Sequence, residues 1–142
     1  MKPYYADDHV TLYHGDCLDV LLSLPDESVD AVVTDPPYFK VVDEPWDKQW
    51  DTADGFTSWL RQVAEQWQRV LRPNGTLYVF ASPQMAARVE LQAVEPAGFV
   101  VLNRIVWHKA SEVINRGNRD GLTQYHSGDN ERIIMAQPVK RD

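Results

Sequence analysis

The segment that decides the fold is Val29-Asp30-Ala31-Val32-Val33-Thr34-Asp35-Pro36-Pro37-Tyr38. Residues 29–34 form a β-rich apolar run, which is typical of a strand buried on both faces of a parallel sheet. Two consecutive prolines cannot continue a central strand, because they donate no hydrogen bonds to the neighbouring strands. We therefore predict a strand over residues 29–34 whose carboxyl end carries Asp35 and Tyr38.

The segments around it alternate between helical and extended patterns. Apolar residues follow helical spacing from Phe56 to Leu71, and residues 72–75, Arg-Pro-Asn-Gly, end the pattern. Ser82-Pro83 predicts the start of another helix, which should run to about Glu95, before Pro96. The other predicted elements are strands at residues 10–13, 76–81, 99–107 and 132–136 and a helix at residues 17–24. This alternation predicts an α/β fold with a mostly parallel sheet.

The length of 142 residues predicts a single domain, residues 1–142. No stretch is apolar enough to span a membrane, and the N-terminus lacks a signal-peptide pattern, so we expect a cytoplasmic protein without membrane contact. One cysteine, and four histidines without ligand spacing, argue against a structural metal. Residues 109–130 have little apolar periodicity and predict a long polar loop.

The formal net charge of −7 is unevenly distributed along the chain. Residues 1–60 carry 3 Lys and Arg against 13 Asp and Glu, whereas residues 61–142 carry 11 against 8. Neutralisation of phosphates by Lys and Arg supplies most of the non-specific affinity for nucleic acid, so an acidic chain is a poor general polyanion binder. Any role on nucleic acid must therefore depend on a specific site.

The tetrapeptide of residues 35–38 has two possible explanations. It could be a kinked turn with a surface tyrosine. Its place at the carboxyl end of a strand favours a ligand site, because open α/β sheets bind ligands there. The Asp35 carboxylate and the Pro36 carbonyl can each accept a hydrogen from a planar amino group and so direct the nitrogen lone pair at an electrophile. Pro36 and Pro37 restrict the backbone, and Tyr38 offers a ring on which an extruded base can stack.

Four segments together resemble the amino-methyltransferases, which modify exocyclic nitrogens of DNA bases with S-adenosylmethionine. They are Gly15 to Leu21, Leu24 to Asp30, Thr34 to Tyr38 and Val70 to Tyr78. Their order is similar to that of the circularly permuted subgroup of bacteria and their phages, and residues 39–40 and 46–50 resemble phage-borne members. The resemblance implies a Rossmann-like fold, S-adenosylmethionine as cofactor and residues 35–38 as the catalytic motif.

The resemblance also assigns Asp16, Cys17 and Asp35 to the cofactor site. Asp16 matches the acid that faces the adenine of the cofactor, and Cys17 supplies the adjacent backbone amide. From the residues alone, Asp16 follows a strand and precedes a helix, so a helix N-cap explains it equally well. Cys17 has no basic neighbour to activate its thiol, which favours packing over nucleophilic chemistry.

The chain departs from the family at the glycine-rich cofactor loop, typically Phe-x-Gly-x-Gly. None of its seven glycines lies two positions from another. By the family's strand order, two missing strands would lie between those at residues 10–13 and 29–34. We therefore expect an incomplete sheet with an exposed apolar edge beside Thr34 and Asp35, which could pair with a second copy or a complementing segment.

Several side chains outside the tetrapeptide are candidates for substrate contact. Phe39 and Lys40 follow it directly, and Trp46 and Trp50 could cover the target pocket, although packing of their own loop explains the tryptophans as well. The candidates in the predicted loop are Lys109, Arg116 and Arg119. For these three, phosphate contact and simple solvation are both open.

The function predicted from these observations is site-specific methylation of the exocyclic amino group of a flipped base in double-stranded DNA. Aspartate rather than serine at position 35 favours adenine over cytosine. One alternative is a non-catalytic remnant or subunit that acts as a scaffold, which the missing glycine loop favours. Another is an RNA or protein amide methyltransferase, although those relatives usually carry Asn at the first motif position. The resemblance implies a bacterial or phage-encoded protein of the kind used in restriction and modification.

Overall fold

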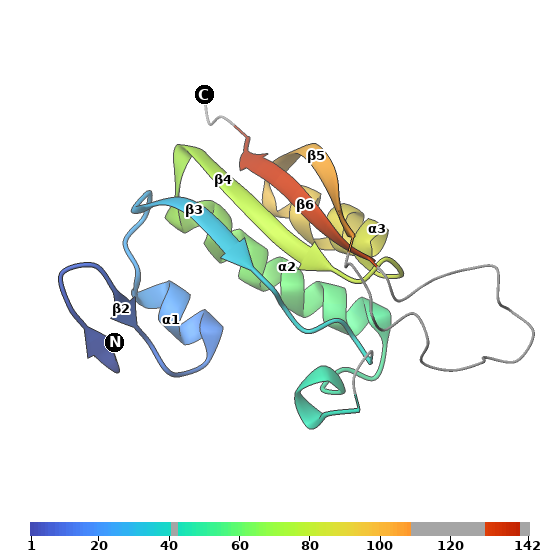
Figure 1. Cartoon of the computed structure of the whole chain (residues 1–142), viewed down its shortest axis with the longest axis horizontal. Helices are drawn as coiled ribbons and strands as arrows, with labels where there is room; N and C mark the ends of the chain where they lie inside the picture. The colour runs from blue at the N-terminus through green and yellow to red at the C-terminus, as the bar shows by residue number, and fades with distance from the viewer. Residues whose placement is uncertain (41–42, 109–129, 140–142) are drawn as a thin grey trace, which may run out of the picture.

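The computed structural model describes residues 1–40, 43–108 and 130–139. Its centre is a four-stranded sheet in the order β3-β4-β6-β5 (Figure 1). The strands are β3 (Val29–Thr34), β4 (Leu71–Ala81), β5 (Phe99–His108) and β6 (Asn130–Pro138). The first two pair in parallel, whereas β6 is antiparallel to both β4 and β5. Three strands therefore run in one direction and β6 opposes them, so the predicted α/β class is confirmed with a mixed sheet.

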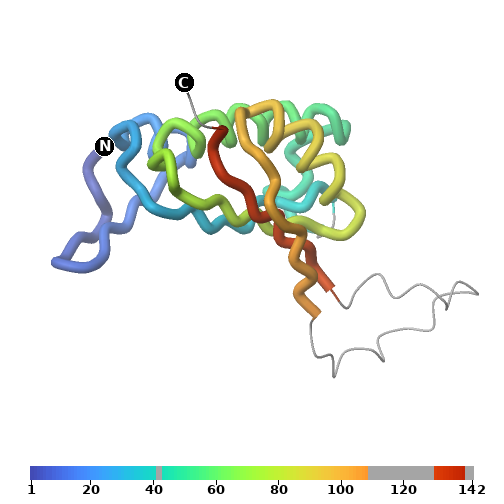
Figure 2. Tube along the Cα trace, turned by 90° about the horizontal axis from the view of Figure 1, so that it is seen from above, coloured from blue at the N-terminus to red at the C-terminus, as the bar shows by residue number. Residues whose placement is uncertain are grey.

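The long helices lie on one side of this sheet (Figure 2). The longest is α2 (Ala53–Val70), and the helical stretch after β4 consists of α3 (Ala86–Val89), η2 (Glu90–Val94) and η3 (Glu95–Ala97). The remaining elements are β1 (Tyr5–Ala6), β2 (Thr11–Leu12), α1 (Cys17–Ser23) and η1 (Pro45–Asp47). No helix in the described ranges has the length and apolar character needed to cross a membrane.

One apolar face of α2 forms the core with β4. Thr52 caps the helix, because its side-chain oxygen accepts a hydrogen bond from the backbone N–H of Gly55 at 3.0 Å. The buried residues of α2 are Phe56, Thr57, Leu60, Val63, Ala64, Trp67 and Val70. Leu77, Val79 and Ala81, which alternate along β4, belong to the same buried cluster. Burying each large apolar side chain stabilises the fold by about 1.5–3 kcal/mol, so this contact holds the sheet and helix together.

The strand β3 has the predicted bounds but not the predicted burial. It is an edge strand, because β4 is the neighbour that bonds to it within the described part of the chain. Val33 is 68% exposed, and Asp30 and Ala31 are exposed as well. The prediction of a strand buried on both faces is therefore wrong for the described structure, where one edge and part of one face of β3 meet solvent.

The predicted strand at residues 10–13 does not join the main sheet. Its central residues form β2, which pairs with β1 in a separate antiparallel hairpin. The hairpin closes because Asp7 Oδ1 accepts hydrogen bonds from the backbone N–H groups of His9 (2.8 Å) and Val10 (2.7 Å). Local turn chemistry therefore decides the partner of this segment.

The strand β4 begins earlier than predicted. Leu71 is already extended as the C-cap of α2, so residues 72–75 belong to the strand rather than to a separate turn. Gly75 packs so closely that a Cβ there would lie 2.8 Å from the Leu71 side chain and 3.0 Å from the carbonyl oxygen of Arg72. The turn-like residues are thus tolerated because the chain needs a close approach at this point.

The helix after β4 begins later and ends later than predicted. Ser82 first forms a turn, in which its carbonyl accepts hydrogen bonds from the N–H groups of Met85 and Ala86. Regular helix starts at Ala86 and the helical stretch continues through Pro96. It ends at Gly98, whose φ of 95° is left-handed, a conformation that glycine adopts without strain.

Candidate active site at the carboxyl end of the sheet

The strand register brings the tetrapeptide to an edge that four strands share. Thr34 of β3 pairs with Val79 of β4, and Ala81 of β4 pairs with Arg132 of β6. The carboxyl ends of β3, β4 and β5 and the beginning of β6 therefore lie at one end of the sheet (Figure 1). Residues 35–38 follow β3 at this end, where open α/β sheets bind their ligands.

The residues of the tetrapeptide differ in exposure. Asp35 is exposed, whereas Pro36, Pro37 and Tyr38 are half-buried. The protein thus supports the prolines and the ring while the carboxylate meets solvent. A planar amino group can therefore approach Asp35 from outside the protein.

Tyr38 lies near two carboxylates. Burial, followed by the carboxylates of Asp35 and Glu131, raises the pKa of Tyr38 above its usual value near 10. The hydroxyl oxygen is buried, yet no group in the described ranges meets it with hydrogen-bond geometry. The carboxylates therefore act on the phenol as nearby negative charge rather than as aligned acceptors.

Tyr38→Phe is expected to reduce the loss of stability at alkaline pH. Because the pKa of Tyr38 is higher in the folded protein than in the unfolded chain, the unfolded chain loses its proton first. The free energy of unfolding therefore falls as the pH rises above about 10, and the variant lacks this contribution. Urea titrations at about pH 8 and about pH 11 measure the difference. Equal losses in both proteins would contradict the assigned surroundings of the hydroxyl.

The turn behind the tetrapeptide is held by Asp47 of η1. Its Oδ1 accepts a hydrogen bond from the backbone N–H of Tyr38 at 2.7 Å, and its carbonyl oxygen accepts one from the N–H of Lys40 at 2.9 Å. Phe39 and Lys40 both have a φ of 62°, a left-handed conformation that is uncommon for residues other than glycine. The direction of the chain after Tyr38 thus depends on contacts with η1.

Two of the predicted substrate-contact residues pack against α2. The Phe39 ring stacks on Phe56 with 5.8 Å between centroids. The Trp50 ring lies 5.1 Å from Phe56 and 4.6 Å from Trp59. These contacts favour the packing explanation for Phe39 and Trp50. Trp46 instead is 52% exposed.

The basic candidates are only partly described. Lys40 is exposed, and its Nζ donates a hydrogen bond to the carbonyl of Asp51 at 2.8 Å while lying 5.1 Å from the centroid of the Phe39 ring. The predicted loop falls outside the described residues except for Asn130, which begins β6. The candidates outside the described residues are therefore Lys109, Arg116 and Arg119.

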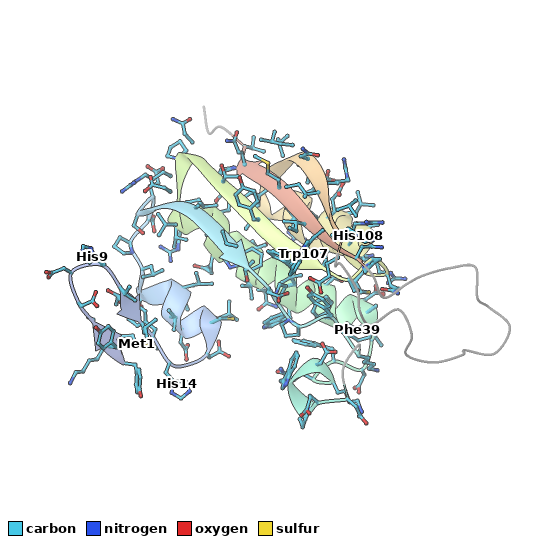
Figure 3. The ribbon with its side chains drawn as sticks, in the orientation of Figure 1. Met1, His9, His14, Phe39, Trp107 and His108 are labelled. Carbon is cyan, nitrogen blue, oxygen red and sulfur yellow. The ribbon has the colours of Figure 1, made fainter. Side chains whose placement is uncertain are left out.

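Sequence reasoning missed two residues at this end of the sheet. Trp107 is 48% exposed, and its ring meets Phe80 edge-on at 5.8 Å. Glu131 pairs with Trp107 across β5 and β6 and lies near Tyr38. Figure 3 shows Trp107, His108 and Phe39 at the same end of the molecule. The signal that could have found them was position, because Trp107 and Glu131 flank the polar loop.

The Asp16-Cys17 turn lies apart from this edge. Asp16 Oδ1 accepts a hydrogen bond from the N–H of Leu18 at 2.8 Å, so the N-cap explanation of Asp16 is confirmed. Desolvation, and then the Asp16 carboxylate, raises the pKa of Cys17, which opposes a reactive thiolate. Figure 3 shows His14, two residues before Asp16, far from Phe39. The structure therefore does not place the predicted cofactor turn against the tetrapeptide.

A cavity of about 260 Å³ lies elsewhere. Its lining residues are Asp26, Glu27, Gln68, Arg69, Leu71, Pro73, Pro138 and Val139. They lie near the beginning of β3 and β4 and the end of β6, away from the carboxyl edge. None of the predicted site residues lines this cavity, so it is not part of the candidate active site.

A family comparison explains the tetrapeptide and its place in the sheet. The model of a family described as DNA methylase matches residues 29–141, which include all four strands of the main sheet. The chain therefore belongs to the DNA methylase family, and the resemblance drawn from its motifs is confirmed.

Curated relatives agree with this assignment. The Type II methyltransferase M2.LlaDCHI of Lactococcus lactis subsp. cremoris is 32% identical over 152 residues, covering 96% of this chain and 53% of that protein. The Type II methyltransferase M.HinfI of Haemophilus influenzae is 30% identical over 132 residues, covering 82% of this chain and 36% of that protein. The chain thus spans about half or less of the length of these relatives.

Solved structures share the fold. A DNA modification methylase of Thermus thermophilus, TTHA0409, in complex with S-adenosyl-L-methionine, has a TM-score of 0.66 and 26% identity, covering 90% of this chain and 55% of that one. The PvuII DNA methyltransferase (cytosine-N4-specific) has a TM-score of 0.74 at 20% identity, covering 99% and 54%. The predicted methyltransferase fold is therefore confirmed.

Proposed function

We propose that residues 1–142 form the catalytic part of a site-specific DNA amino-methyltransferase. The reaction transfers a methyl group from S-adenosylmethionine to the exocyclic amino group of a base flipped out of double-stranded DNA. The observation that carries the proposal is the exposed Asp35 carboxylate at the carboxyl end of β3, followed by two prolines and the half-buried Tyr38. Family membership supports the assignment of these four residues as the catalytic motif.

The proposed roles follow from the chemistry of an amino group on a base. Its nitrogen lone pair is delocalised into the ring, so acceptors that hold both amino hydrogens make the nitrogen a better nucleophile. Asp35 and the Pro36 carbonyl are the proposed acceptors, and the proline torsions keep that carbonyl in place. Tyr38 stacks on the flipped base, a contact worth about 1–3 kcal/mol.

S-adenosylmethionine, when bound, supplies a methyl group on a positively charged sulfur. The nitrogen–carbon bond forms as the sulfur–carbon bond breaks, and the methylated amino group then releases one proton to solvent. Asp35 stabilises the positive charge that develops on the nitrogen before that proton leaves. No covalent intermediate with the protein is required.

We propose adenine rather than cytosine as the target base. Asp35 supports this preference, because the motif resemblance associates aspartate with adenine at this position. Methyl incorporation into adenine-rich and cytosine-rich duplexes tests it. Transfer to cytosine alone would reject the preference and leave the amino-methyltransferase assignment intact.

We propose that DNA reaches the carboxyl edge from the side of Trp46 and Lys40. Both side chains are exposed, and both lie in the segment that follows the tetrapeptide. Lys109, Arg116 and Arg119 are proposed as phosphate contacts, which position a duplex without reading its sequence. A DNA substrate would place the activity in the bacterial cytoplasm.

The described residues fit only one side of the cofactor. Asp16 is exposed at the start of α1, where its carboxylate and the adjacent amides can read an amino-purine edge. The chain has no Gly-x-Gly pair for close approach of the backbone to the ligand. We therefore propose that a complementing segment supplies this loop and pairs with the exposed edge of β3, a second copy of the chain being the alternative partner.

Calorimetric titration with S-adenosylmethionine tests the cofactor assignment. We expect weak or no binding to the 142-residue chain alone, and micromolar affinity, about 8 kcal/mol, once the complementing segment is present. Size-exclusion mass measurement over a range of concentrations tests the edge. A stable monomer whose β3 amides are fully protected in hydrogen exchange would reject pairing at that edge.

A scaffold without catalysis is the second candidate function. The absence of a Gly-x-Gly pair favours it, because such a chain keeps the base-binding turn without holding the cofactor alone. No methyl transfer in any combination with the complementing segment, together with retained DNA binding, would select the scaffold over the enzyme.

A further inference from the structure

Asp47 is a buried acid within an exposed segment. Its exposed fraction is 0%, whereas Glu44, Pro45, Trp46 and Lys48 around it are exposed. A carboxylate removed from water is strongly unfavourable unless hydrogen bonds compensate the charge. The burial of Asp47 therefore calls for a structural reason in its contacts.

Those contacts join Asp47 to the catalytic motif. The carboxylate oxygen Oδ1 accepts a hydrogen bond from the backbone N–H of Tyr38 at 2.7 Å, a short, charge-assisted bond. The Asp47 carbonyl accepts a second bond from the N–H of Lys40 at 2.9 Å. The N–H of Asp47 donates to the Glu44 carbonyl at 3.1 Å, which closes the η1 turn. One residue thus binds the backbone on both sides of Phe39.

The bonded segment has a conformation that needs support. Phe39 and Lys40 are consecutive left-handed residues with side chains, each with a φ of 62°. Such conformations persist only when the surroundings enforce them. The stacking of Phe39 on Phe56 and the bond from Lys40 Nζ to Asp51 contribute, but the Asp47 bonds act directly on the backbone of this turn.

We propose that Asp47 is a positioning residue for the methyl-transfer site. Its carboxylate fixes the backbone amide of Tyr38, and thereby the direction of the Tyr38 ring and the strand-to-turn path of the prolines before it. Asp47 does not touch the base or the cofactor in this proposal. The role rests on the proposed function, because positioning has meaning only if residues 35–38 receive the base.

Backbone amide hydrogen exchange of the 142-residue chain tests the hold itself. Asp47→Asn keeps a neutral acceptor, Asp47→Ala removes it, and Asp43→Asn is the control, since its side chain is 93% exposed in the same segment. We expect the Tyr38 amide to exchange about tenfold faster in Asp47→Ala and less than about fivefold faster in Asp47→Asn, because a neutral acceptor is weaker. Amides of α2 and the control should match wild type.

Unchanged exchange at Tyr38 in both Asp47 variants would overturn the proposal. If Asp47→Ala does not fold, the decision passes to Asp47→Asn, where an unchanged Tyr38 amide overturns it and a selective increase supports it. Equal acceleration of the Tyr38 and α2 amides would indicate general loosening and would also overturn it.

Methyl transfer by the active preparation tests the consequence for catalysis. We expect kcat to fall at least about tenfold in Asp47→Ala, with the Kd for DNA changed by less than about threefold and with kcat largely kept in Asp47→Asn. A rise in KM alone would overturn positioning. Absence of transfer by wild type defeats the proposed function instead, and the exchange experiment then still decides whether Asp47 holds Tyr38.

Discussion

Asp35→Ala is expected to lower the rate of methyl transfer to DNA about a thousandfold, because it removes one of the two proposed acceptors for the amino group. Asp35 is exposed, so little folding energy depends on its side chain. The loss should therefore appear in kcat, with the midpoint of urea unfolding nearly unchanged. Tritium transfer from labelled S-adenosylmethionine to a duplex, in the preparation that binds the cofactor, measures it.

Asp30→Ala is the matched control for this variant. Asp30 lies on the same strand, β3, and its side chain is 82% exposed beside Arg72. That exposed ion pair contributes at most about 1 kcal/mol, so the control should stay within about twofold of the wild-type rate. Turnover of Asp35→Ala at the level of the control would defeat the proposed mechanism.

Phe56→Ala is expected to lower the free energy of unfolding by about 3–5 kcal/mol, because it opens a cavity in the core. Phe56 is 1% exposed, and its ring contacts Phe39, Trp50 and Trp59 at centroid distances of 5.8, 5.1 and 6.1 Å. Domains of this kind are stable by only about 5–15 kcal/mol. The variant should therefore unfold at a much lower urea concentration than wild type.

Trp46→Ala provides the comparison for the aromatic residues of this region. Trp46 is 52% exposed, so its removal should change the free energy of unfolding by less than about 0.5 kcal/mol. The same variant should weaken DNA binding if Trp46 faces the duplex as proposed. Similar destabilisation by Phe56→Ala and Trp46→Ala would contradict the description of Phe56 as the centre of the cluster.

The Phe56 prediction also bears on the catalytic motif. Phe39 follows Tyr38 directly and rests on Phe56, while Asp47 bonds the backbone of Tyr38. Core packing and the buried acid therefore act on the same turn from two sides. A variant that loosens the cluster should lower methyl transfer by more than its unfolded fraction explains.

The sequence determined those features that depend on local residue chemistry. The apolar run of residues 29–34 predicted β3 with its observed bounds, and apolar spacing located α2 to within a few residues. The tetrapeptide identified the family, because a proline pair after a strand constrains the backbone whatever surrounds it. These predictions succeeded because they rest on torsions, caps and periodicity within one segment.

Features that depend on contacts between distant segments were decided only by the tertiary structure. An apolar strand has the same composition at an edge as in the centre of a sheet, so the exposure of β3 followed only from its neighbours. The placing of Glu131 near Tyr38 needed the register of β6, and the burial of Asp47 needed the packing of η1 beneath a strained turn. The physical reason is that burial and charge proximity belong to pairs of segments, whereas torsional preference belongs to each segment by itself.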